Sequence, residues 1–193
     1  MLTWIIRNRI RAFEKAYNYD MSYARLVLQA DTSAMLALSK VTALSSYRKD
    51  VPREVYYAAK VESTLAADCG PCAQLVITMA LRDGVAATTL AAVVEAIRSG
   101  NDQGLSAEVA LGVRFAKAVR THSPAADAMR DTIVNKWGPR GLVSLAFAIT
   151  AAQIYPTLKY ALGHGHACQR LDIAGTFVVP PTAAHVAPAP SAA

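Results

Sequence analysis

Apolar residues recur at helical spacing along most of the chain. Near its start, Ile6, Ile10, Phe13 and Tyr17 follow one another at intervals of four, three and four, which predicts a basic amphipathic helix over residues 3–18. The same periodicity predicts further helices at residues 21–30, 32–45, 53–67, 73–84, 87–100, 106–120, 124–136 and 139–153. The pattern therefore indicates an all-α chain.

Glycine and proline mark where several of these helices end. Gly84 and Gly100 each follow a periodic segment, as is usual at helix C-termini. Pro156 closes an uncharged stretch, residues 141–156, that is shorter than the roughly 20 residues a membrane-spanning helix needs. We therefore expect a buried core helix here, ended by Pro156, and no contact with a membrane.

The C-terminal part of the chain has a different pattern. The stretch "GTFVVPP", residues 175–181, is the only one that resembles a strand, and it is too isolated to build a sheet. Residues 179–193 are rich in Pro and Ala without periodicity, which is typical of a flexible tail. Residues 1–178 are thus expected to form a single helical domain.

Composition narrows the class of protein. Of the 193 residues, 53% are hydrophobic and only 18% are charged, so the helices bury more than a narrow stripe and favour self-association. The net charge of +6 comes from basic residues mixed with acids and aromatics, which does not favour nucleic-acid binding. The start, "MLTWIIRNRIRAF", lacks the order of a secretory signal, and the three cysteines are an odd number. These features predict a cytoplasmic protein.

Two of the cysteines, Cys69 and Cys72, lie within one helical turn in "DCGPCAQLV". Asp68 suits an N-cap and Pro71 suits the first turn of the helix that follows. Spacing by three residues puts the two Cα atoms about 5 Å apart, within the range that a disulfide requires. The free N–H groups of a first turn also stabilise a thiolate, so at least one of the two sulfurs should be nucleophilic.

Three interpretations of this pair remain open. The pair is a redox dithiol, or two buried thiols, or half of a zinc site completed by His164, His166 and Cys168 in "HGHACQ". The residues before the pair read as a helix, whereas a strand precedes the redox pair of a thioredoxin fold, so the shared CGPC tetrapeptide does not indicate a thioredoxin.

The segment "KVESTLAADCGPCAQLVITMALRDGV" resembles the core of the alkyl hydroperoxidase D-like (carboxymuconolactone decarboxylase) superfamily, over roughly residues 50–120. The resemblance implies a multi-helix bundle that assembles into trimers or hexamers. It also implies reduction of a small-molecule hydroperoxide without a cofactor, followed by regeneration by an external dithiol or protein reductant. In that family the second cysteine attacks the peroxide and the first resolves it, roles that carry over to Cys72 and Cys69.

The chain departs from this family at two positions of the proton relay. Val76 stands where the family has a histidine, and Tyr57 stands where it has a glutamate. Glu62, seven residues before Cys69, is the candidate substitute for the proton carrier, and it could equally be a helix residue paired with a nearby Lys or Arg. Tyr57 and Gln74 could supply hydrogen bonds. The alternative function is therefore a non-enzymatic helical oligomer or a redox sensor.

Overall fold

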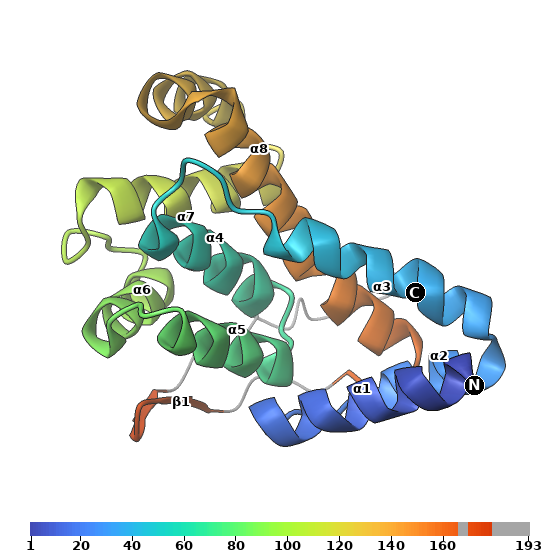
Figure 1. Ribbon diagram of the computed structural model, residues 1–193. Helices are drawn as coiled ribbons and strands as arrows, with labels where there is room; N and C mark the ends of the chain where they lie inside the picture. The colour runs from blue at the N-terminus through green and yellow to red at the C-terminus, as the bar shows by residue number, and fades with distance from the viewer. Residues whose placement is uncertain (166–169, 179–193) are drawn as a thin grey trace, which may run out of the picture.

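Helix α4 (Arg53–Ala66) lies at the centre of the computed structural model, which describes residues 1–165 and 170–178 (Figure 1). Every residue of this helix from Ala58 to Leu65 is buried, and it packs against α5, α6, α7 and α8. The elements around α4 are, in chain order, α1 (Leu2–Tyr17), α2 (Ser22–Ala30), α3 (Thr32–Ser46), α5 (Gly70–Arg82), α6 (Ala87–Ser99), α7 (Ala107–Arg120), α8 (Ala126–Ala161), β1 (Leu171–Ile173) and β2 (Thr176–Val178). The all-α prediction is confirmed for the described residues.

The close approach of α7 to α4 depends on Gly112. A Cβ atom at this position would lie 2.8 Å from Val55 Cγ1 and 3.0 Å from the Val55 carbonyl oxygen. The first distance is shorter than Cβ atoms show in proteins and the second is tighter than most, so this close approach of the backbones depends on the absence of a side chain at residue 112. This contact belongs to the main core, which α4 to α8 build together with the hairpin.

Helix α8 consists of two segments that meet at Gly138, whose φ of 66° and ψ of 178° break the helical path. The expectation that Pro156 ends the second segment is wrong, because the helix continues to Ala161. Pro156 is buried, and this burial offsets the backbone hydrogen bond that a proline inside a helix removes.

Helix α8 is long and apolar enough by composition to cross a membrane, a property that core helices of soluble proteins share. In its most apolar window 44% of the residues are buried inside the structure. Leu145, Ala148 and Ile149 on this helix belong to the main core.

The strand-like stretch near the end of the described chain has a partner. Strand β2 pairs with β1 in an antiparallel hairpin, with Leu171 opposite Val178 and Ile173 opposite Thr176. The turn between them, Ala174 and Gly175, has positive φ at both residues, which is typical of a two-residue hairpin. The expectation of an isolated strand is therefore wrong, since the three residues of β1 are too few to be recognised by alternation. Residues 179–193, the expected tail, lie outside the described residues.

Helices α1, α2 and α3 form a separate layer with its own small core. This core consists of Ile10, Tyr19, Tyr23, Ala24 and Leu28. The layer lies beside the second segment of α8, with α3 running alongside that helix (Figure 1). The cavity described below lies between this layer and helices α4, α5 and α8.

Candidate functional site

The connection between α4 and α5 sets the position of the two cysteines. Asp68 has φ 48°, in the left-handed region that Asp tolerates better than most residues, and Cys69 occupies the N-cap position of α5. The expectation that Asp68 is the N-cap is therefore wrong by one residue, because the left-handed turn shifts the cap to the cysteine. Pro71 lies in the first turn, as expected.

A disulfide joins Cys69 to Cys72, with the Cα atoms 5.2 Å apart. The expected one-turn spacing is thereby confirmed. Cys69 is 3% exposed and Cys72 is 4% exposed, so neither sulfur lies on the outer surface. The two differ in their surroundings, because Cys72 lines the large cavity and Cys69 is not among the residues that line it.

The cavity has a volume of about 1030 Å³, and its walls come from α1 to α5 and α8. Most of the wall is apolar, including Ile6, Ile10, Phe13, Met35 and Leu75. A concave, mostly apolar space with a few polar groups is the usual form of a small-molecule site. Cys72 would therefore meet a molecule that enters it.

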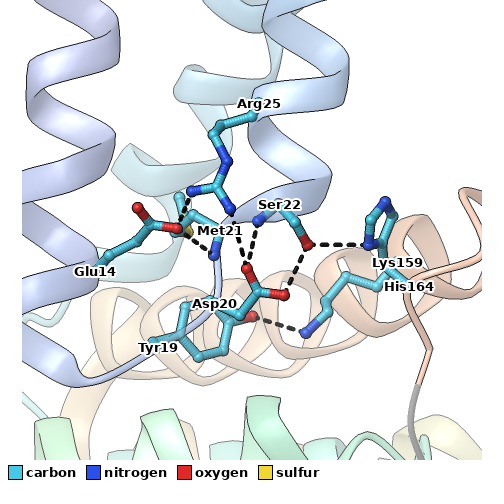
Figure 2. Close-up of polar contacts among 8 residues, drawn as sticks. All are labelled: Glu14, Tyr19, Asp20, Met21, Ser22, Arg25, Lys159 and His164. Carbon is cyan, nitrogen blue, oxygen red and sulfur yellow. Dashed lines mark hydrogen bonds and ion pairs between the residues drawn. The ribbon is translucent and has the colours of Figure 1, made fainter.

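The hydroxyl group of Tyr19 lies 3.9 Å from the Cys72 sulfur, a hydrogen-bonding contact for an atom as large as sulfur. Since a disulfide sulfur carries no hydrogen, Tyr19 is the donor in this state. The ammonium group of Lys159, on α8, donates to the Tyr19 oxygen over 3.4 Å (Figure 2). A chain of two contacts thus runs from Lys159 through Tyr19 to the Cys72 sulfur.

Burial changes the acidity of both groups in this chain. It raises the pKa of Tyr19 to about 12, so the phenol stays protonated at neutral pH and can donate to a thiolate. Burial also lowers the pKa of Lys159, which makes its ammonium a stronger acid than an exposed lysine. The arrangement suits delivery of a proton toward the cavity.

Polar contacts around the turn between α1 and α2 hold Tyr19 in place. Asp20 accepts hydrogen bonds from the Ser22 backbone and hydroxyl at 2.8 and 2.7 Å, and Arg25 contacts both Glu14 and Asp20 (Figure 2). His164 contacts the Ser22 hydroxyl through Nδ1 at 3.0 Å. The contact of His164 with Ser22 thus joins the layer of α1 to α3 to the segment that follows α8.

Glu62 lies elsewhere. Its side chain is 4% exposed and pairs with Arg120 of α7 at 3.0 Å, while its second oxygen, Oε2, is buried without a hydrogen-bond partner among the described residues. Glu62 is not among the residues that line the cavity with Cys72. A nearby Lys or Arg was one of the two alternatives that the sequence offered for Glu62, whereas its partner Arg120 lies 58 residues further along the chain.

The other residues named from the sequence have separate roles. Val76 and Tyr57 line the cavity, so both positions of the family relay face the same space as Cys72. The Gln74 side-chain amide donates to the Asp172 backbone oxygen at 2.9 Å and accepts from the Asp172 backbone N–H at 2.8 Å. Gln74 thereby anchors the hairpin to α5 and, within the described part of the chain, makes no hydrogen bond to the sulfurs. Burial raises the pKa of Tyr57.

Sequence reasoning missed Tyr19 and Lys159. The sequence "YNYDMSY" contains several tyrosines, and no spacing rule singles out the one that meets Cys72, 53 residues further on. Lys159 reaches Tyr19 only because α8 continues beyond Pro156.

The zinc interpretation depends partly on residues outside the described part of the chain. Among the described residues, no group of three or more His, Cys, Asp or Glu side chains is placed to hold a metal ion. His166 and Cys168, which that interpretation needs, lie outside the described residues.

The chain was compared with protein-family models, curated proteins and solved structures, and it matches none of them. The resemblance to the hydroperoxidase superfamily therefore remains an expectation from the motif.

Proposed function

We propose that this protein is a thiol–disulfide oxidoreductase that reduces organic hydroperoxides through Cys72 and Cys69. The observation that carries the proposal is the position of Cys72, which faces a mostly apolar cavity and contacts the Tyr19 hydroxyl at 3.9 Å. Cys69 lies one turn away, outside the cavity lining, where a resolving cysteine is needed. This difference in exposure to the cavity supports the order of attack that the family resemblance implies.

The cycle starts from the two reduced cysteines. The Cys72 thiolate attacks one peroxide oxygen, the O–O bond breaks, and the departing alkoxide takes up a proton and leaves as an alcohol. Cys72 is now a sulfenic acid. The Cys69 thiol attacks its sulfur, the S–O bond breaks, and water leaves as the disulfide forms. An external dithiol or protein reductant then supplies two electrons and two protons, so the balance closes without a flavin, haem or metal.

Tyr19 is the proton donor in this proposal. In the reduced state its hydroxyl stabilises the Cys72 thiolate, and it then gives a proton to the alkoxide as the O–O bond breaks. Lys159 positions Tyr19 and restores its proton. The pair thus takes the place of the family's relay, for which Val76 and Tyr57 provide no carboxylate or imidazole.

Oxidation of the fully reduced protein by one equivalent of an organic hydroperoxide tests the redox step. We expect a product about two mass units lighter, in which peptide mapping finds the Cys69–Cys72 link. Steady consumption of peroxide with excess dithiol should follow. A link to Cys168, or no link, would refute the dithiol chemistry, whereas oxidation in a single turnover without a cycle would indicate the redox sensor.

The assembly is proposed to be a homo-oligomer, with three or six subunits suggested by the resemblance, in the cytoplasm. The supporting observation is a group of exposed large apolar residues on α1, among them Leu2, Trp4 (66% exposed) and Ile5. Burial of such side chains between subunits is a common source of association energy. Light scattering at micromolar concentration should give a multiple of the 20.5 kDa chain mass, and a monomer would contradict the proposal.

A further inference from the structure

Lys60 is a buried cation that the redox chemistry does not use. It is 4% exposed, lines the cavity, and donates to the backbone oxygen and the hydroxyl of Ser45, each at 3.0 Å. Its Nζ atom also lies 5.2 Å from the centre of the Tyr56 ring and 5.9 Å from that of Tyr57. An ammonium group has three donors, so one remains beyond the two that Ser45 accepts.

Among the described residues, no carboxylate lies within ion-pair distance of Lys60; the salt bridges include none that involves it. A buried charge without a counter-ion is costly, and such groups are normally paired. A ligand that brings an anionic group to Lys60 would therefore supply the counter-ion that the described residues do not provide.

Most of the other charged residues of the lining are also basic. Four basic residues line the cavity, namely Arg9, Arg48, Lys60 and Arg82, against the single acid Asp83. Asp83 already pairs with Arg48 at 3.3 Å. The cavity as a whole therefore favours an anion over a neutral or cationic molecule.

The rest of the lining determines what the anion carries. The walls are mainly aliphatic and aromatic, and a volume of about 1030 Å³ is at the upper end of the range for small-molecule sites. A small inorganic anion would leave most of this apolar surface uncovered. A molecule with one carboxylate and a long hydrocarbon chain matches both the basic residues and the apolar walls of the cavity.

We propose that the cavity is a binding site for a long-chain carboxylic acid, with its carboxylate paired to Lys60 and its alkyl chain along the apolar walls. Binding does not depend on the redox state of the cysteines. That such an acid, when it carries a hydroperoxide on its chain, is also the substrate of Cys72 is a separate step, which rests on the proposed function.

The pH dependence of binding follows from the state of Lys60. Burial lowers its pKa to about 8, so below this pH it is mainly the ammonium that a carboxylate requires. The groups with raised pKa values that share the cavity with it are Tyr56 and Tyr57 on α4, Tyr19 before α2, Tyr23 on α2 and Tyr155 on α8. The other ionisable groups of the lining are Tyr17, Cys72, Arg9, Arg82 and the Arg48–Asp83 pair. The tyrosines stay neutral between pH 6 and about 9, so Lys60 should control the profile. Affinity is expected to be nearly constant from pH 6, where the carboxylate is ionised, to about pH 7, and to fall toward tenfold per pH unit above pH 8.

The test uses the full chain and two probes with the same alkyl chain, dodecanoate and dodecanol, by titration calorimetry below the micelle concentration of dodecanoate and the solubility limit of dodecanol. Dodecanoate should bind about tenfold or more tighter at pH 7, since hydrogen bonds to charged groups are worth that much. The replacement Lys60→Met should remove this difference and leave dodecanol binding unchanged. Lys40→Met, at an exposed lysine of α3, is the matched control and should bind like the parent.

Each alternative outcome is informative. Equal affinities for the two probes in the parent, or no binding of either, overturn the proposal. Because this comparison needs no variant, the proposal can be refuted even when Lys60→Met does not fold. An unchanged dodecanoate affinity in Lys60→Met also overturns it. Equal dodecanoate affinity in the disulfide form and the dithiol-reduced form of the parent is expected, and it separates this site from the redox function: the redox proposal can fail while the carboxylate site stands, and the reverse.

Discussion

Replacement of Cys72 by serine should abolish peroxide consumption, while replacement of Cys69 by serine should stop the cycle one step later. Serine is a far weaker nucleophile, and loss of a nucleophile costs on the order of 10³-fold or more. In Cys69→Ser, Cys72 still attacks, and the product should be a sulfenic acid about 16 mass units heavier than the reduced protein. Mass spectrometry after one equivalent of hydroperoxide distinguishes the two variants.

The matched control for this pair is Cys168→Ser, which should be oxidised and reduced like the parent. The opposite pattern, with Cys72→Ser forming a sulfenic acid and Cys69→Ser inert, would reverse the assignment. In that case the N-cap position of Cys69 on α5 would determine reactivity, and contact with the cavity would not.

Removal of the Tyr19 hydroxyl should have the second largest effect. We expect Tyr19→Phe to slow oxidation of Cys72 by about 10²-fold, the usual contribution of a positioned acid, with the disulfide still able to form. Because the thiolate loses a hydrogen-bond donor, the pKa of Cys72 should rise and the pH–rate profile should move to higher pH. Lys159→Met, which acts through Tyr19, should shift the profile in a similar way with a smaller loss. Stopped-flow oxidation between pH 5 and 9 provides the measurement.

Glu62→Gln is the natural comparison, because Glu62 is the proton carrier suggested by the sequence. Its carboxylate pairs with Arg120 and does not line the cavity, so we expect a rate within a few-fold of the parent together with reduced thermal stability. A parental rate in Tyr19→Phe beside a 10²-fold loss in Glu62→Gln would place the relay on α4 instead.

The features that were predictable from the sequence are those determined by neighbouring residues. Periodicity and terminal residues located most helices to within two residues, as at α3, predicted over residues 32–45, and at α6, whose C-cap is Gly100. The spacing of Cys69 and Cys72 fixed their Cα separation in the same local way. The continuation of α8 through Pro156 was not predictable, because burial of that residue overrides a local rule.

The polar groups of the site depend on packing between distant segments. Tyr19, Cys72 and Lys159 come from three separate parts of the chain, and Arg120 reaches Glu62 because Gly112 lets α7 approach α4. Lys60 reads as an ordinary solvated lysine in "YYAAKVES", and only the position of α3 beside α4 reveals that it is buried. Contacts between residues so far apart in the chain cannot be predicted from the local pattern of a single sequence.

The burial of both sulfurs has a kinetic consequence. Thiol–disulfide exchange requires the incoming sulfur to touch one of the two bonded sulfurs, yet Cys69 and Cys72 expose only 3% and 4% of their surface. A protein reductant can therefore exchange with this pair only when the structure around the sulfurs opens locally. The frequency of that opening then sets a ceiling on turnover by a protein reductant, however fast the chemistry at the sulfur is.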